Sequence, residues 1–261
     1  MKTSWGKVAG WYDELLEKQT DTYQHEVILP NLLRVLAPKK GETILDIACG
    51  QGFFSRELAK LEGGKAIKVL GCDIAPELIE TARRNPDPIS KNISYTVAPA
   101  DNLDFCPNNS VDGAIVVLAL QNIENIGGVF SECARVLKSG LQSRLIVVLN
   151  HPAFRIPKHS SWEWDTEKSK QYRRIDAYMI DIRERIDMNP GSTFDTKQFT
   201  TSFHRPLQVY SKALAKHGFA ITRLEEWISH KQSKQGPRSN EEDRMRKEIP
   251  MFLMLEVKKL G

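Results

Sequence analysis

Residues 43–53 read Thr-Ile-Leu-Asp-Ile-Ala-Cys-Gly-Gln-Gly-Phe, an apolar run that ends in a Gly-x-Gly turn. The run predicts a strand, and Leu58 and Leu61, at helical spacing, predict that a helix follows the turn. Gly50 and Gly52 permit backbone angles that other residues avoid, and their missing Cβ atoms let a ligand approach the backbone. The free N–H groups that open such a helix favour anionic ligand groups. A unit of this kind is typical of sites for nucleoside-bearing ligands.

The Gly-rich turn does not complete the dinucleotide fingerprint Gly-x-Gly-x-x-Gly, because Ser55 stands at the third glycine position. It resembles instead motif I of class I S-adenosylmethionine-dependent methyltransferases, which has the form acidic-x-x-x-Gly-x-Gly. A tight turn or a different nucleotide site is the alternative. The resemblance implies that S-adenosyl-L-methionine is the cofactor and that residues of this motif contact it: Asp46, Ala48, Cys49, Gly50 and Gly52.

Bulk composition narrows the class of protein. The chain has 261 residues, of which 41% are apolar, enough for one large α/β domain with an insertion. Because no apolar run approaches the ~20 residues that span a bilayer and no signal-peptide core is visible, we expect a cytoplasmic protein. The four cysteines lack C-x-x-C pairing and are expected to be reduced thiols, not zinc ligands. A net charge of +4 does not indicate a nucleic-acid binder.

The remaining chain alternates between strand and helix patterns. Two helices are expected within residues 8–36. Near the other end of the sequence, a polar loop is expected at 231–249, and the final strand pair is expected to be antiparallel. The pattern predicts an α/β fold: a Rossmann-like, doubly wound seven-stranded sheet with an antiparallel last strand, plus a lid insertion. Strands are expected from 43 and at 66–72, 93–98, 113–118, 144–149, 219–228 and 251–257, with helices at 76–84, 126–137 and 207–217.

The resemblance to class I methyltransferases covers nearly the whole chain, so residues 1–261 are interpreted as a single methyltransferase domain. Residues 1–40 would form its N-terminal helices. Residues 150–204, between strands five and six, would form a lid and acceptor insertion, and the segments 180–187 and 198–204 inside it predict an irregular β-hairpin. A homodimer formed through this lid is one way to cover the exposed hairpin edges.

Asp73 ends the second expected strand, 21 residues after Gly52. A carboxylate at this point accepts hydrogen bonds from both ribose hydroxyls in nucleotide-binding sheets, and Ile74 follows it in the same turn. The alternative is that Asp73 caps the helix that begins near Pro76. The cofactor carries a positive charge at sulfur. An acidic site therefore favours this cofactor over a ligand with a negatively charged diphosphate.

Three further segments resemble cofactor contacts of the family. In Ala-Pro-Ala-Asp-Asn-Leu, Asp101 would accept a hydrogen bond from the adenine amine, while the backbone N–H of Asn102 or Leu103 would donate to the ring; an Asx turn is the alternative, and both can hold. Leu118, at the end of the fourth strand, would lie beside the methionine part. Trp11 and Tyr12 resemble an aromatic pair that closes over the cofactor, or they are ordinary core or surface aromatics.

Methyl transfer from a sulfonium is an in-line displacement that mainly needs alignment and exclusion of water, so the family has no universal catalytic residue. His151, which follows the fifth strand, and His204 are the candidates for a catalytic base. The alternative for His151 is that it orients the loop before Pro152. His204 is interpreted as structural or acceptor-facing if it is not catalytic.

The insertion is rich in aromatic and charged residues. Its aromatic side chains would line an acceptor pocket or simply pack the lid, and its basic ones would bind an acidic substrate or form solvated ion pairs with the acids of the same stretch. The aromatic residues are Phe154, Trp162, Trp164, Tyr172 and Tyr178, and the basic ones are Arg155, Lys158, Arg173, Arg174, Arg183 and Arg185.

These observations leave four functions to be compared. The first is methyl transfer to a small organic acceptor at an oxygen, nitrogen or carbon atom, similar to quinone-biosynthesis and natural-product methyltransferases. The second is methylation of RNA or protein. Basic residues within 231–247 favour it, although acidic residues interrupt this basic stretch. The third is a non-catalytic cofactor-binding scaffold or regulator. An NAD oxidoreductase is disfavoured by Ser55 and by the antiparallel final pair.

Overall fold

The computed structural model describes residues 21–61, 67–84, 91–140, 142–188 and 199–260. Their main feature is a seven-stranded sheet in the order β10-β11-β5-β4-β1-β2-β3. β11 lies between β5 and β10 and runs antiparallel to both, whereas the other neighbours are parallel. The predicted α/β fold with an antiparallel last strand is therefore confirmed. The strands are β1 (Thr43–Ile47), β2 (Lys68–Asp73), β3 (Ile93–Val97), β4 (Gly113–Val117), β5 (Arg144–Asn150), β10 (Phe219–Trp227) and β11 (Phe252–Lys259).

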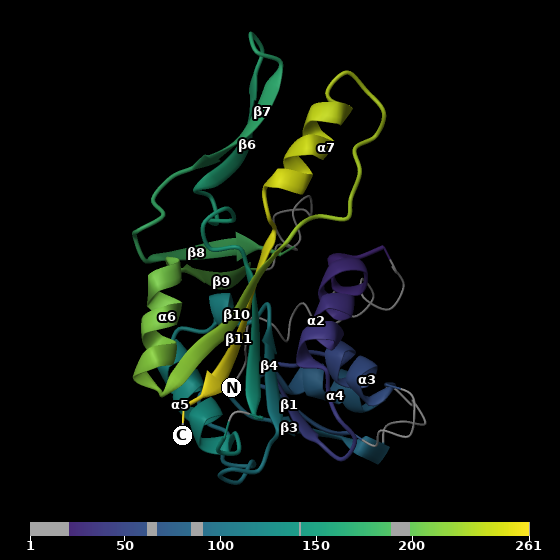
Figure 1. Ribbon diagram of the computed structural model, residues 1–261, viewed down its shortest axis with the longest axis vertical. Helices are drawn as coiled ribbons and strands as arrows, with labels where there is room; N and C mark the ends of the chain where they lie inside the picture. The colour runs from purple at the N-terminus through teal and green to yellow at the C-terminus, as the bar shows by residue number, and fades with distance from the viewer. Residues whose placement is uncertain (1–20, 62–66, 85–90, 141, 189–198, 261) are drawn as a thin grey trace.

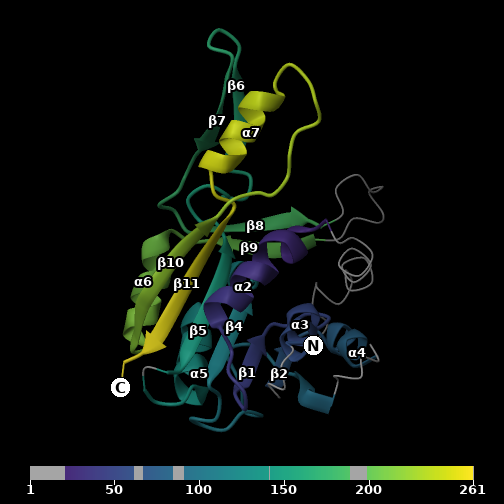
Figure 2. The same ribbon diagram turned by 45° about the vertical axis from the view of Figure 1, so that its right-hand side comes forward.

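Helices cover both faces of the sheet (Figure 1, Figure 2). One apolar core packs α5 and α6 against the sheet and the other packs α2 and α3 against its opposite face. Alternate residues of β5 enter the two cores, which explains why this strand is apolar throughout. These helices, with the short η4 that follows β4, are η2 (Gln24–Ile28), α2 (Leu29–Leu36), α3 (Phe53–Ala59), α4 (Pro76–Arg84), η4 (Leu120–Asn122), α5 (Ile126–Val136) and α6 (Leu207–Lys216).

The segment between β5 and α6 folds as two hairpins. β8 (Ile182–Asp187) pairs antiparallel with β9 (Phe199–His204), close to the hairpin predicted from the sequence. A second hairpin, β6 (Ser160–Asp165) with β7 (Lys170–Ile175), was not predicted. Its strands mix charged and polar residues with a few aromatic ones, and none of their side chains is buried, so neither strand has the apolar core face that signals a half-buried strand.

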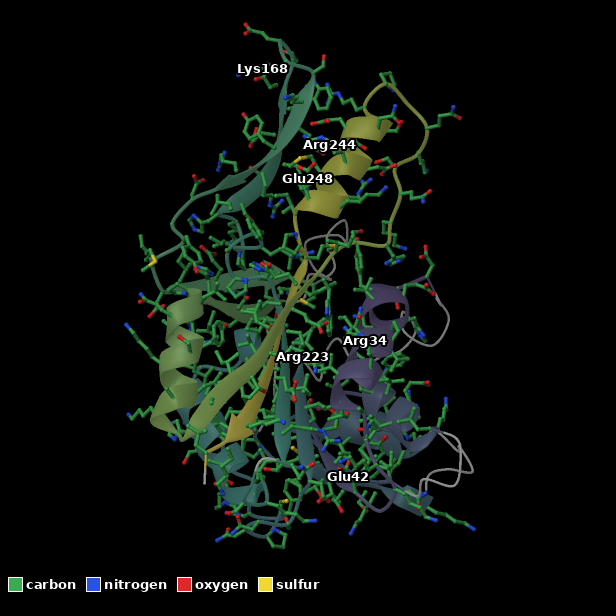
Figure 3. The ribbon with its side chains drawn as sticks, viewed as in Figure 1. Arg34, Glu42, Lys168, Arg223, Arg244 and Glu248 are labelled. Atoms are coloured by element: carbon green, nitrogen blue, oxygen red, sulfur yellow. The ribbon has the colours of Figure 1, made fainter. Side chains whose placement is uncertain are left out.

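The expected polar loop at 231–249 is wrong in its second half, where α7 (Ser239–Glu248) forms. Arg244 pairs with Glu241 and Glu248 at helical spacing, and these side chains lie along one helix (Figure 3). Tertiary contacts also support α7, because Glu241 accepts a hydrogen bond from the Gln171 backbone at 3.0 Å. The helix and the β6–β7 hairpin lie side by side and project away from the sheet (Figure 1, Figure 2).

Candidate functional site

A cleft of about 360 Å³ lies at the carboxyl ends of β1, β2 and β4. Most of the cofactor residues predicted from the sequence meet here, because parallel strands end at one edge of the sheet. Gly52, Asn102 and Leu103 are not among the lining residues, and Trp11 and Tyr12 lie outside the described residues. The predicted residues that do line the cleft are Asp46, Ala48, Cys49, Gly50, Asp73, Ile74, Asp101 and Leu118.

The two motif glycines have different roles. Gly50 has φ 58°, and a Cβ there would meet no atom within 4 Å, so this backbone faces the open cleft. Gly52 has φ 82°, and a Cβ there would lie 2.4 Å from the Tyr95 hydroxyl, so this glycine admits Tyr95 and does not line the cleft. Ala48 and Leu118 have φ 57° and 52°, angles that side chains resist and that are often held at functional sites.

Asp73 connects two of the strand ends. Its carboxylate accepts a hydrogen bond from the Gly50 backbone at 3.0 Å and another from Ala75 at 2.9 Å. Burial raises the pKa of Asp73, and these backbone N–H groups oppose the rise. Asp73 therefore shapes the turns after β1 and β2 and also lines the cleft, so the structural alternative and the binding role are compatible.

Asp46 supplies a second buried carboxylate to the cleft. It accepts a hydrogen bond from the Ser55 hydroxyl at 2.6 Å. Burial raises its pKa to about 7, the Ser55 bond opposes this, and the negative charge of Asp73 raises it further. Because Ser55 holds Asp46 in place, the residue that breaks the dinucleotide fingerprint has a direct structural purpose. The cleft is strongly acidic, and its acidic lining residues are Asp46, Asp73, Asp101 and Glu124.

Asp101 faces the cleft from the turn after β3. Its carboxylate accepts a hydrogen bond from the Asn125 side chain at 2.9 Å, and Asn125 in turn caps α5 by accepting from Gly128. The two backbone donors expected beside Asp101 are already used within the protein: Asn102 donates to Pro99, and the buried Leu103 donates to Glu132. The geometry therefore favours the turn alternative for Asn102 and Leu103.

The two candidate bases lie away from the cleft. Nδ1 of the buried His151 accepts a hydrogen bond from the Ala153 backbone at 3.2 Å, which leaves Nε2 to donate to Glu226 at 2.8 Å. Burial lowers the pKa of His151, and Glu226 opposes this. His204 donates from Nε2 to the Tyr178 carbonyl at 2.8 Å, and burial lowers its pKa as well. Both arrangements favour the structural alternative for these residues.

A second cavity of about 430 Å³ borders the cleft and shares Leu118 and Asn122 with it. Its other walls come from the chain after β5, from β7 and from the β8–β9 hairpin. Gln121 lies between the two, where its amide donates to the Leu118 carbonyl at 2.7 Å. The Gln121 Oε1 atom is buried and has no hydrogen-bond partner among the described residues.

Arg205 holds the wall between the cleft and the second cavity. Its guanidinium donates to the carbonyls of Leu120, Ile123 and Glu124 at 3.2, 2.8 and 2.8 Å. Nothing local to Phe-His-Arg-Pro shows that Arg205 reaches a loop about 80 positions earlier, so the sequence pattern does not reveal this role.

The part of the chain that the structure describes holds neither a membrane-spanning helix nor a cluster of metal ligands. In that part of the chain no helix is long and apolar enough to cross a bilayer. Nor do the described His, Cys, Asp and Glu side chains gather in groups of three or more that would hold a metal ion.

Known proteins match both the motif region and the fold. Residues 44–140 match a family described as "Methyltransferase domain". A demethylmenaquinone methyltransferase from Tropheryma whipplei is 37% identical over 120 residues, 46% of each chain. A 2-phytyl-1,4-naphtoquinone methyltransferase from Nostoc punctiforme is 29% identical over 56% of this chain and 63% of its own. The chain thus spans about half to two thirds of the length of these curated relatives.

A solved structure extends the similarity over most of the chain. The S-adenosylmethionine-dependent methyltransferase from Mesorhizobium loti has a TM-score of 0.66 and 25% identity, covering 88% of this chain and 96% of its own. The acidic cleft after β1 and β2, the seven-stranded order and these matches agree with one another. Residues 44–140 therefore carry a methyltransferase domain, and the fold of most of the chain is similar to that of S-adenosylmethionine-dependent methyltransferases.

Proposed function

We propose that this protein transfers a methyl group from S-adenosyl-L-methionine to a small organic acceptor, at an oxygen, nitrogen or carbon atom, by in-line displacement. The observation that carries the proposal is the pair of cavities that meet at Leu118 and Asn122: one is acidic and made by the motif residues, and the other is bounded by the insertion. A donor and an acceptor bound in two such cavities would meet at their common wall.

The residues present fit the cofactor. When bound, S-adenosylmethionine supplies an electrophilic methyl group on a positively charged sulfur. The carboxylates of Asp46 and Asp73 favour a cation in the cleft, and Asp73 and Asp101 are acceptors for ribose hydroxyls and an adenine amine. Gln51 lines the cleft with a buried Nε2 that has no partner among the described residues, a donor suited to a carboxylate.

The second cavity is proposed to align the acceptor. Gln121 Oε1 would accept a hydrogen bond from an acceptor hydroxyl or amine, and Leu118 and Asn122 would exclude water beside the reacting atoms. Neither His151 nor His204 lines either of these two cavities. A mechanism based on alignment, without a histidine base, is therefore the one that the geometry supports.

The named relatives support a small acceptor. The Tropheryma and Nostoc proteins are named for quinone methylation, and two such relatives make a ring-containing acceptor a reasonable class for this chain. The RNA alternative loses part of its sequence support, because two basic residues of α7 have acidic partners in the same helix: Arg244 pairs with Glu241 and Glu248, and Arg246 pairs with Asp243.

Residues 150–204 are proposed to act as the lid and acceptor insertion of a single domain over 1–261. Their support is that this segment contributes walls to the second cavity. We further propose a homodimer through the lid, which the half-exposed Trp162 and Tyr172 of the β6–β7 hairpin favour. Sedimentation of the wild type against a Trp162→Ser, Tyr172→Ser double variant would test it, with a monomer expected for the variant. A cytoplasmic location is proposed because the described cysteines are free and buried.

Calorimetry tests the proposed function most directly. We expect S-adenosylmethionine and S-adenosylhomocysteine to bind the purified chain with dissociation constants in the micromolar range, and NAD not to bind. Binding of both sulfur nucleosides would justify a screen of phenolic and quinol acceptors, with S-adenosylhomocysteine release as the readout. A folded sample that binds neither would contradict the proposal and favour the scaffold alternative.

A further inference from the structure

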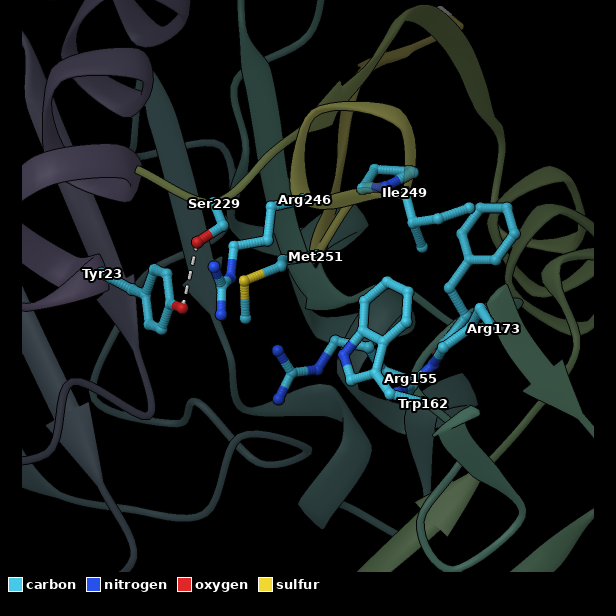
Figure 4. Close-up of a pocket in the computed structure, with 10 residues that line it drawn as sticks. Tyr23, Arg155, Trp162, Arg173, Ser229, Arg246, Ile249 and Met251 are labelled. Carbon is cyan, nitrogen blue, oxygen red and sulfur yellow. Dashed lines mark hydrogen bonds between the residues drawn. The ribbon is translucent and has the colours of Figure 1, made fainter. Parts of the chain in front are cut away.

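Arg155 lies where three cavities meet. It lines the 430 Å³ cavity, a 290 Å³ cavity between the insertion and the segment after α7, and a narrow space of about 30 Å³ near His204. In Figure 4, Arg155 and Trp162 lie on one side of the 290 Å³ cavity, and Arg246 and Met251 lie opposite them. Arg155 is exposed, and its side chain is open to solvent through these cavities.

The charge of Arg155 is not balanced by an acid. Among the described residues, its guanidinium has no hydrogen-bond or ion-pair partner, and the residues that line the three cavities include no Asp or Glu. Other basic residues of the insertion differ in this respect, since Lys158 pairs with Glu184 and Arg174 pairs with Asp176. The expectation of solvated ion pairs therefore holds for Lys158 and Arg174 but not for Arg155.

Arg173 adds a second cation to the same walls. It donates to the Phe154 carbonyl at 2.8 Å and to the Ser160 hydroxyl at 2.7 Å, and it lies 5.1 Å from the centre of the Trp162 ring. These neutral partners fix its position and leave its charge in place. Reduced hydration lowers the pKa of both arginines, and the charge of Arg155 lowers the pKa of Arg173 further. An anion between them would relieve this repulsion.

We propose that Arg155, with Arg173 beside it, binds an anionic group of the methyl acceptor, a carboxylate or a phosphate. The guanidinium fork matches the paired oxygens of either group. The role of this anion site in the reaction rests on the proposed function. The acceptor would enter the 430 Å³ cavity with its reactive atom toward Leu118 and Asn122 and its anionic group toward Arg155 and Arg173.

Binding of simple anions to the full chain tests the proposal without knowledge of the natural acceptor. Benzoate, inorganic phosphate and the neutral isostere benzamide would be titrated by calorimetry and by chemical-shift perturbation. We expect benzoate or phosphate to bind in the millimolar range and benzamide to bind at least about tenfold more weakly, as for a lost charge-assisted hydrogen bond. Tighter binding of benzoate would identify the anionic group of the acceptor as a carboxylate, and tighter binding of phosphate would identify it as a phosphate.

Variants locate the site. Arg155→Gln should weaken anion binding by about tenfold or more, and Arg155→Lys, which keeps the charge, should restore part of it. Arg174→Gln is the matched control, because it removes the same charge from an exposed arginine of the adjacent β6–β7 hairpin that already pairs with Asp176 at 2.7 Å. The proposal is overturned if neither anion binds, if benzamide binds as well as benzoate, or if Arg155→Gln binds as the wild type does.

S-adenosylhomocysteine separates this inference from the proposed function. Its affinity should be the same in wild type, Arg155→Gln and Arg174→Gln, because neither arginine lines the cleft. Loss of anion binding with retained S-adenosylhomocysteine binding supports the anion site. Retained nucleoside binding with no anion binding in the wild type rejects the anion site alone, whereas absent nucleoside binding rejects the proposed function.

Discussion

The cleft after β1 and β2 and the cavities beneath the insertion carry charges of opposite sign. Asp46, Asp73, Asp101 and Glu124 line the cleft, with no Lys or Arg among its described lining residues. Arg155 and Arg173 line the cavities on the other side of Leu118 and Asn122, where the described lining residues include no acid. A cationic donor and an anionic acceptor would each be attracted to its own side.

The two regions are also built differently. The cleft consists of short turns that follow consecutive strands, with local bonds such as that from the Ala75 backbone to Asp73. The cavities are formed by segments distant in sequence: α7 and the chain after it, the β6–β7 hairpin and the start of η2. Changes in the cleft should therefore alter cofactor binding, while changes around the cavities should alter anion binding alone.

The largest expected effect concerns Asp46. Its folded-state pKa of about 7 exceeds the ordinary 3.8, so its contribution to stability is fully present below about pH 4 and is lost as pH rises through 7. The loss is at most on the order of 4 kcal/mol. Asp46→Asn, which carries no charge, should flatten this dependence in urea unfolding compared between about pH 5 and about pH 8. An unchanged slope would contradict the raised pKa of Asp46.

Asp73→Ala should weaken S-adenosylmethionine binding by about 1.5–3 kcal/mol, the value of a hydrogen bond to a charged group. Calorimetry measures this, and benzoate binding in the same sample should not change, because Asp73 does not line the cavities around Arg155. Equal affinity of variant and wild type for S-adenosylmethionine would remove Asp73 from the ribose site. An equal loss of benzoate binding would show that the two regions are not independent.

His151→Ala should cost about 1–3 kcal/mol of unfolding free energy, as for other buried residues that hold a hydrogen-bond network. The His151 ring accepts a hydrogen bond from the Ala153 backbone, and the substitution removes this bond from the turn that precedes Arg155. It should therefore also weaken benzoate binding and spare S-adenosylhomocysteine binding. Because burial lowers the pKa of His151, its contribution to stability is lost as pH falls through a value below 6.5. Lost turnover with intact stability and benzoate binding would support the catalytic base instead.

The smallest effect is expected for Gly50→Ala. Its φ of 58° disfavours alanine by roughly 1 kcal/mol, and the new methyl group would enter open space in the cleft. Cofactor affinity should fall several-fold with little change in benzoate binding. Gly52→Ala is the companion variant, whose Cβ would meet Tyr95 at 2.4 Å and lower stability through packing. A Gly50 variant with full affinity would show that this backbone does not contact the cofactor.

Sequence patterns predicted the sheet well because each strand and helix around it carries its own periodicity. They failed for α7, whose residues are almost all polar and which is stabilised by ion pairs and by contacts with the β6–β7 hairpin. They also failed for that hairpin, since neither of its faces is fully buried. In both places tertiary contacts, not local preference, decide the structure.

The sequence by itself determined the order of the strands along the chain, the Gly-rich turn and the acids that end up in one cleft. These follow from local rules, because a turn between a strand and a helix is encoded within about ten residues and parallel strands bring their ends together. Only the tertiary structure decided that His151 holds a loop and that Arg205 fixes the wall at Glu124. It also decided that Arg155 and Arg173, unlike Arg174, have no acidic partner among the described residues. Such pairings depend on which distant segments meet, and no local pattern records that.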